Sequence, residues 1–545
     1  MVRACYYTVT AGTRAITKRE PSPATEQTNG DEAPNDQPPA LAAFGAHKPV
    51  RAMSRDSSLV DRISRGFRAQ FIAQLCYIAS NIVLILLLTR VFLDPTGYGR
   101  LHFALSVLGV VGLVAILGLP KSAARYVTEY LETDPTQVRY VIRQSVVFVG
   151  VLAVTVSAVL AAVSGPLAVW LGQPSSAPFL RLGSLYVVAY AFSSHLISLF
   201  QGLNRVEWSA RLKALTGVGR VVFAVVFILA GFGPLGALIG YIAGDALASV
   251  VGAVALYFGQ YRQLAPTTSP EAGLRRRLVE YSIPLTATKG AGALDKRVDA
   301  ILVGALLNPA AVGYYVLAKQ ISDVAVAPAG SFGFALSPTI GEQAAGDNDD
   351  EAARLYESSL RHVLLLYVPA ATGLALVAEP TVRFVFGTEY LPAVPVVQVF
   401  AGFVVVNTIT QITSDGLDYL GRARSRAIAK GIAAVANFLL NLALIPVIGV
   451  VGAAVATVVT HTFYMAANVT VIHRELNLAL PSLLSDIGLV LGITVGMAGA
   501  VWLARPFVSG PLAFVGTVLL GGVVWFVLSV VSGMLRPAQV KSVLL

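Results

Sequence analysis

The chain has 545 residues, of which 55% are hydrophobic and 13% are charged. A soluble domain carries about 25% charged residues, so this composition excludes a string of soluble domains and predicts an all-α polytopic membrane protein. The net charge of +10 does not indicate nucleic acid as a partner, because the basic residues gather in alternate loops. Cys5 and Cys76 do not indicate a disulfide framework, since Cys76 lies in a predicted membrane span.

Residues 1–53 differ in composition from the rest of the chain. The stretch from Pro21 to Pro39 is rich in Pro, Glu, Asp, Asn and Gln, and it cannot bury enough apolar surface to fold. We expect either a disordered cytoplasmic tail or a segment that is not translated, with Met53 as the first residue. From Ser58, a capping box and apolar residues at helical spacing predict an amphipathic helix that runs into the first span.

Long apolar runs then follow one another to the C-terminus. A helix needs about 20 mostly apolar residues to cross a bilayer, and about fourteen runs approach or exceed that length. The predicted spans are 71–93, 99–118, 139–163, 178–201, 211–231, 234–258, 282–305, 313–337, 360–385, 391–413, 426–446, 449–472, 483–503 and 511–533.

The charges of the loops give a separate test of this count, because cytoplasmic loops collect Lys and Arg. Basic loops alternate with nearly bare ones along the whole chain, and only Arg383 and Arg505 break the alternation. An even number of spans is therefore predicted, with both termini in the cytoplasm. A missed or extra helix would invert the alternation from that point onward.

An internal repeat divides the spans. Pro95 and Pro309 begin similar turns 214 residues apart, and Gly99 and Gly313 follow at the same spacing. Two six-helix units that run in the same direction imply a pseudo-two-fold axis along the membrane normal, and such transporters bind substrate between the halves. The predicted parts are a tail (1–53), a first bundle (54–262), a second bundle (263–475) and a C-terminal helix pair (476–545).

Charged side chains interrupt the predicted spans 282–305 and 313–337. A charge at the bilayer centre costs roughly 2.5–3.5 kcal/mol, so such residues face a cavity or a partner. Helical spacing places Lys289, Lys296 and Asp299 along one side. These charges form either a closed structural network or the lining of a substrate cavity, and both interpretations stay open. The candidate substrate-binding residues are Lys289, Asp295, Lys296, Arg297, Asp299, Lys319 and Asp323.

Two further charges lie inside predicted spans of the first half. Arg220 and Asp245 both fall near mid-depth. They either pair with each other as structure, or Asp245 serves as a proton or sodium site that couples transport to an ion gradient.

Other motifs do not indicate an enzyme, a metal site or a cofactor. The D-x-D sequence at Asp347 falls in an acidic loop, where a solvated segment is the better interpretation. His195 and His461 are isolated in separate spans and favour polar packing between helices. The sequence contains no H-E-x-x-H motif, no Walker A loop and no G-x-S-x-G motif.

Four short segments, ordered along residues 60–540, resemble one known family. They are Leu87–Gly99 (LLTRVFLDPTGYG), Leu117–Tyr126 (LGLPKSAARY), Phe200–Arg205 (FQGLNR) and Asp299–Gly304 (DAILVG). The chain resembles the polysaccharide biosynthesis flippases, the polysaccharide transporter branch of the multidrug/oligosaccharidyl-lipid/polysaccharide exporter superfamily. The run Asp295-Lys296-Arg297 departs from that pattern.

The resemblance implies a V-shaped pair of six-helix bundles that work by alternating access. It implies a multi-pass protein of the cytoplasmic membrane that moves an undecaprenyl- or dolichyl-linked oligosaccharide to the outer leaflet. The implied partners are this lipid-linked oligosaccharide, membrane lipid, and a glycosyltransferase or polymerase of the same pathway.

Three other functions fit parts of the sequence. A cation-coupled multidrug exporter of the same fold usually has twelve helices and an acidic cavity, so the last two spans and the cations at Lys296 and Arg297 argue against it. A lipid II flippase of the same superfamily shares the fourteen helices and the cationic cavity. A membrane-bound oligosaccharide polymerase or ligase would need large outer loops, and the predicted outer loops are short.

Overall fold

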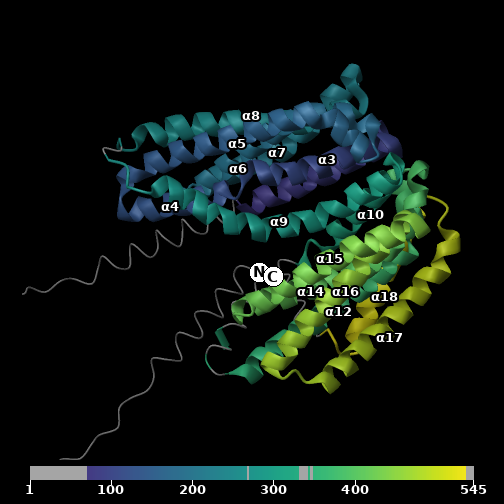
Figure 1. Ribbon diagram of the computed structural model, residues 1–545. Coiled ribbons are helices and arrows are strands. Elements are labelled where there is room, and N and C mark those ends of the chain that lie inside the picture. Colours follow the sequence, from purple (N-terminus) through teal and green to yellow (C-terminus); the bar gives the residue numbers. More distant parts are fainter. Residues whose placement is uncertain (1–69, 267–268, 330–341, 344–345, 347, 536–545) are drawn as a thin grey trace, which may run out of the picture. The chain divides into compact units, whose positions relative to one another are not determined.

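The computed structural model describes residues 70–535, apart from 267–268, 330–341, 344–345 and 347. Every regular element in those residues is helical, which confirms the predicted all-α fold (Figure 1). The predicted N-terminal tail and amphipathic start lie outside the described residues, as do Asp347 and the end of the span predicted at 313–337. The helices discussed below belong to one compact unit, Ser64–Phe526, which includes all but the last residues of α18.

In the first half of the chain, each predicted span coincides with a helix. The helices pack mainly as neighbours in the sequence, with α7 against α8 and α5 against α6, and α6 also contacts α3 and α8. Their bounds are Gln70–Phe92, α3 (Pro95–Ile116), α4 (Leu119–Thr133), α5 (Pro135–Trp170), α6 (Ala177–Gly202), α7 (Val206–Phe227) and α8 (Gly233–Gly259).

The span prediction misses α4. This helix is amphipathic rather than apolar, so a search for membrane spans passes over it, although its buried residues do recur at helical spacing. Its buried side packs against α5, α6 and α9, while Lys121 and Arg125 stay exposed. The buried residues of α4 are Leu119, Pro120, Ser122, Ala123, Tyr126, Val127 and Tyr130.

The second half of the chain is also built from long helices. Among these, α14 packs against α12 and α16, α15 packs against α16, and α17 packs against α12. The bounds are α9 (Leu274–Leu306), α10 (Pro309–Val326), α12 (Asp349–Leu376), α13 (Ala378–Thr381), α14 (Val394–Tyr419), α15 (Ala423–Ile448), α16 (Val450–Leu476), α17 (Leu480–Ala504) and α18 (Pro511–Val531).

Eleven stretches of the described residues are long and apolar enough to cross a membrane. One of them, Val206–Gln263, contains two of the predicted spans. The spans predicted in α9 and α10 are not among the eleven. The protein is therefore a multi-pass membrane protein, and the count of fourteen spans stays a prediction, as does the division into two bundles and a helix pair.

The two repeated turns meet each other where α3 crosses α10. Asp94 accepts a hydrogen bond from the Gly97 amide at 3.0 Å, and Asn308 accepts one from the Ala311 amide at 2.9 Å, so both helices begin with the same cap. A Cβ atom at Gly99 would lie 1.7 Å from the carbonyl oxygen of Pro309. A Cβ atom at Gly313 would lie 2.4 Å from the carbonyl oxygen of Pro95. Only glycine permits this backbone contact, and each turn supplies one glycine and one proline to it.

Arg383 and Arg505, the two residues that break the loop-charge pattern, share one carboxylate. Both donate to Glu379, at 2.9 Å and 3.1 Å. These contacts tie α13 and the segment after it to the end of α17, and one carboxylate partners both cations. Loop charge alone could not anticipate this, because Glu379 lies 126 residues before Arg505.

We predict that Gly99→Ala lowers the apparent melting temperature of the purified protein in detergent. The added methyl group has no room against the Pro309 carbonyl, and overpacking of this kind costs about 1–3 kcal/mol. Gly431→Ala is the matched control, because a Cβ atom at this position in α15 meets nothing within 4 Å. Equal melting temperatures for the two variants would show that α3 and α10 do not depend on the close crossing.

Candidate functional site

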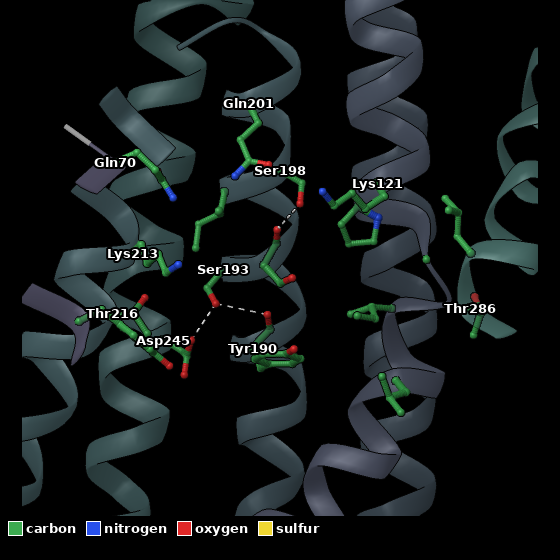
Figure 2. A pocket seen from close by; sticks show the side chains of 18 of the residues that line it. Gln70, Lys121, Tyr190, Ser193, Ser198, Gln201, Lys213, Thr216, Asp245 and Thr286 are labelled. Carbon is green, nitrogen blue, oxygen red and sulfur yellow. Dashed lines mark hydrogen bonds between the residues drawn. The ribbon is translucent and has the colours of Figure 1, made fainter. Parts of the chain in front are cut away.

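The largest cavity described here, with a volume of about 490 Å³, lies among helices of the first half. Its wall comes from the helix Gln70–Phe92, from α3, α4, α6, α7 and α8, and from two residues of α9. Figure 2 shows Lys121 and Lys213 extending toward the side chains of α6 from opposite sides. The polar residues of the wall are Gln70, Tyr77, Lys121, Tyr190, Ser193, Ser194, Ser198, Gln201, Lys213, Thr216, Arg220, Asp245 and Thr286.

The charge of this cavity is positive. Lys121, Lys213 and Arg220 contribute three cations, whereas Asp245 is the only carboxylate among the described residues of the wall. Lys213 donates to the side-chain oxygen of Gln74 at 2.6 Å, a neutral partner that leaves its charge in place. Arg220 and Asp245 form the ion pair described next, so the positive charges of Lys121 and Lys213 remain uncompensated by a carboxylate of the described wall. Such a cavity attracts anions.

Arg220 and Asp245 form a buried ion pair at the side of the cavity. The Nη2 and Nε atoms of Arg220 donate to one Asp245 oxygen at 2.8 Å and 3.3 Å, and Ser193 donates to the other oxygen at 2.8 Å. The guanidinium also lies 5.1 Å from the ring centroid of Tyr241. Of the two alternatives that the sequence allowed, the structure forms the Arg220–Asp245 pair. Arg220 therefore compensates the carboxylate that was suggested as an ion-coupling site.

A second, more open cavity of about 340 Å³ adjoins the first and shares Lys121, Gln201 and Leu285 with it. Arg125 adds another cation there, with its guanidinium 4.1 Å from the ring centroid of Tyr281. The cations at Arg125 and Lys121 therefore continue the positive charge from the larger cavity to the more open one.

The described side chains among the residues predicted on α9 have different partners. The side chains of Lys289 and Asp295 lie outside the described residues. Arg297 turns toward α3, where its Nη1 donates to the Leu105 carbonyl at 2.7 Å. The guanidinium occupies the space that a side chain at position 109 would fill, because that residue is glycine.

Asp299 is buried in a network of neutral donors. Its carboxylate accepts hydrogen bonds from Tyr315 at 2.7 Å, Thr457 at 2.9 Å and Asn441 at 3.0 Å. These donors lie on α10, α16 and α15, so Asp299 joins four helices. None of these three donors is a lysine.

Lys296, Lys319 and Asp323 lie in one region. Asp323 is exposed and is within electrostatic range of both lysines. The Lys319 ammonium also lies 6.0 Å and 5.8 Å from the ring centroids of Phe400 and Phe403. Of the predicted residues on α9 and α10 whose side chains the structure describes, none lines the cavity of about 490 Å³.

The main cavity could have been found from polar residues at helical spacing. Lys213, Thr216 and Arg220 recur at i, i+3 and i+7, which places them on one face of a helix. Ser194, Ser198 and Gln201 recur at i, i+4 and i+7, which likewise places them on one face of α6. In spans that are otherwise apolar, such stripes indicate a polar path.

No metal site is apparent in the part of the chain that the structure describes. It contains no group of three or more His, Cys, Asp or Glu side chains that could hold a metal ion. His195 is fully buried on α6, and neither ring nitrogen has a hydrogen-bond partner among the described residues.

The described helices thus form a multi-pass membrane protein around a cationic cavity. The chain belongs to the polysaccharide biosynthesis protein family, because the model of that family matches residues 87–395, more than half of its length. This agrees with the resemblance found in the sequence.

Three known proteins illustrate the relationship. The chain is 22% identical over 295 residues to a Haloferax volcanii protein named "Probable low-salt glycan biosynthesis flippase Agl15". The match covers 53% of this chain and 61% of that protein, which is less than two thirds of its length.

Two solved structures share the fold at 14% identity. Lipid II flippase MurJ in an inward closed conformation gives a TM-score of 0.68 and covers 86% of this chain and 98% of that one. An inward-facing multidrug resistance MATE transporter gives a TM-score of 0.62, with 74% and 94% covered. The fold is thus common to flippases and drug exporters and does not choose between them.

We predict that Arg220 and Asp245 stabilise the protein only together, and that either charge without its partner destabilises it. Breaking such a pair costs about 3–5 kcal/mol, because one buried charge remains uncompensated. Arg220→Met and Asp245→Leu should each lower the melting temperature strongly, and the double variant should recover part of the loss. Additive losses in the double variant would mean that the two side chains do not stabilise each other.

Proposed function

We propose that the protein is a flippase that carries a lipid-linked oligosaccharide from the cytoplasmic to the outer leaflet. The observation that carries this proposal is the cationic cavity of about 490 Å³ enclosed by apolar helices. Positive charges inside a membrane protein carry a desolvation cost, and they usually mark the path of a polar or charged substrate. Here the positive charge suits an anionic group.

The chemistry of the cavity suits a lipid diphosphate joined to sugars. Lys121 and Lys213 would bind phosphate oxygens as point charges. Ser194, Ser198 and Gln201 line the same cavity and offer hydroxyl and amide groups to the hydroxyls of a sugar. In this proposal the Arg220–Asp245 pair holds α7 against α8 beside the substrate. The first contact with the substrate is made by the lysines.

Alternating access would carry the substrate across, with the residues of α9 and α10 facing it at a later stage. In this proposal Lys289, Lys296 and Lys319 attract the anionic head group, while Asp295 and Asp323 balance their charge. Arg297 and Asp299 hold α9 in place through the contacts described above. Asp245 stays a candidate for ion coupling only if transport loosens its pairing.

The proposed setting is the cytoplasmic membrane, with both termini in the cytoplasm. A glycosyltransferase would supply the substrate on the inner face, and a polymerase or transferase would use it outside. The protein itself acts as a transporter rather than an enzyme.

Two alternatives share the fold. A multidrug exporter for cationic drugs would need an available carboxylate in the cavity, and Asp245 is already paired, which favours the anionic substrate. A lipid II flippase carries the same lipid diphosphate, so only the attached sugars distinguish it. Transport of lipid II by the purified protein, with no transport of a lipid-linked oligosaccharide, would favour that alternative.

We predict that Lys121→Gln and Lys213→Gln abolish most glycan export at normal protein abundance. Each change removes a cation that the proposal assigns to the diphosphate and leaves the buried pair intact. Surface glycan should fall and lipid-linked glycan should accumulate inside a deletion strain that carries either variant. Arg424→Gln is the control, because Arg424 is an exposed cation outside the cavity. Normal export by both lysine variants would remove the cavity from the substrate path.

We predict that two neighbouring cations on α9 differ in effect. Arg297→Ala removes a charged hydrogen bond, which is worth about 1.5–3 kcal/mol, and should lower the melting temperature. Lys296→Ala should leave the melting temperature unchanged, since Lys296 is exposed, and should slow glycan export. A thermal-shift measurement alongside the export assay separates these effects. Normal export by Lys296→Ala would exclude this lysine from the path.

A further inference from the structure

A smaller cavity of about 270 Å³ lies between the first helix and α10 and differs in chemistry from the cationic one. None of the described residues in its wall is Lys or Arg. Its polar residues come from four helices, and most of the remaining wall is aliphatic. They are Asn81, His102, Tyr241, Gln320 and Asp323.

Two amides, a carboxylate and two aromatic rings next to an aliphatic wall match the surface of a sugar ring. Sugar hydroxyls both donate and accept hydrogen bonds, and the C–H face of the ring packs against aromatic side chains. Asp323 is exposed and can accept, while Asn81 and Gln320 can each donate and accept. A phosphate would be repelled by the Asp323 carboxylate, and an isoprenoid chain would desolvate these polar groups without compensation.

The wall of this cavity is held in place by neighbouring contacts. Tyr98 donates to the Oε1 atom of Gln320 at 2.5 Å, which orients the Gln320 side chain. The ring of His102 lies 4.4 Å from that of Tyr98, centroid to centroid. Asn81 donates from its amide nitrogen to the Tyr77 carbonyl at 2.9 Å, which orients the side chain. Its Oδ1 atom is the group that can accept a hydrogen bond.

The two cavities adjoin through Tyr241 and Arg220. Tyr241 lines the small cavity, and its ring lies under Arg220, which lines the large one. Tyr77 and Ile78, which are consecutive in the chain, line the large and the small cavity respectively. The two cavities are therefore neighbours, with the Arg220–Tyr241 contact between them.

We propose that the small cavity is a subsite for one uncharged sugar ring, the one nearest the diphosphate of the lipid. This inference rests on the proposed function and adds to it a separate recognition of the sugar. A volume of about 270 Å³ is close to the lower limit of small-molecule sites, about 300 Å³, and suits one ring rather than a chain of sugars.

The test compares two probes with the purified full chain in lipid nanodiscs. One probe is undecaprenyl diphosphate, and the other is undecaprenyl diphosphate bearing one hexose, taken in turn as glucose, galactose and N-acetylglucosamine. The wild type should bind at least one sugar-bearing probe more tightly than the sugar-free probe. Asn81→Leu and Asp323→Leu should each weaken binding of that sugar-bearing probe about tenfold or more. Asn81→Leu should bind the sugar-free probe as the wild type does, and Asp323→Leu should bind it no more weakly, because that change removes only a negative charge.

Two control variants separate this inference from the proposed function. Arg424→Gln changes an exposed cation outside both cavities, so it should bind both probes normally. Lys213→Gln should weaken binding of both probes. If neither probe binds the wild type, the proposed function itself fails.

If both probes bind the wild type equally, or if Asn81→Leu and Asp323→Leu weaken both probes equally, the sugar subsite is wrong. Competition by undecaprenol that depends on Asn81 would likewise overturn it, because the cavity would then hold the lipid chain.

Discussion

A guanidinium and a carboxylate inside a bundle of apolar helices can stay charged only if each compensates the other. Arg220 and Asp245 meet this constraint with two hydrogen bonds, a third from Ser193 to the carboxylate, and an aromatic ring beneath the guanidinium. The pair connects α7 to α8 and forms one side of the largest cavity. Because the pair is neutral as a whole, the net charge of the described part of that wall comes from Lys121 and Lys213.

The constraint also separates structural charges from accessible ones. Arg297 and Asp299 sit two residues apart on α9, yet each is held by the protein in a different place, one by the Leu105 carbonyl and the other by three neutral donors. Lys296 lies next to Arg297 and is exposed. The partners of a charged residue in a membrane span thus determine whether it holds helices together or stays accessible. Two charged residues that are close in the sequence can have different roles.

Apolar length predicted the helical fold well. Every predicted span overlaps a described helix, because the need for about 20 apolar residues is a local property of the chain. The same rule did not predict α4, because the charged residues on one side of this helix lower its average hydrophobicity. The repeat was visible because Pro95, Gly99, Pro309 and Gly313 are constrained by backbone geometry, which few other residues satisfy.

The site was harder to predict, since its residues come from many helices. Thr457 lies 158 residues from Asp299, and Asn441 lies 142 residues away, so the spacing within α9 could not reveal either partner. Arg297 turned away because position 109 on α3 is glycine, which no property of α9 indicates. The pairing of Arg220 with Asp245 could be anticipated, because two opposite charges at similar depth have few other ways to be compensated.

The crossing of α3 and α10 has a consequence for the origin of the repeat. Gly99 contacts the Pro309 carbonyl while Gly313 contacts the Pro95 carbonyl, so the same pair of residues is used twice, once in each direction. That reciprocity is the pattern of an isologous interface in a two-fold dimer. A single ancestral unit with one Pro-x-x-x-Gly turn would have supplied both contacts of a homodimer before its gene was duplicated and fused. After fusion, the two glycines would be inherited separately, and each could be lost without the other.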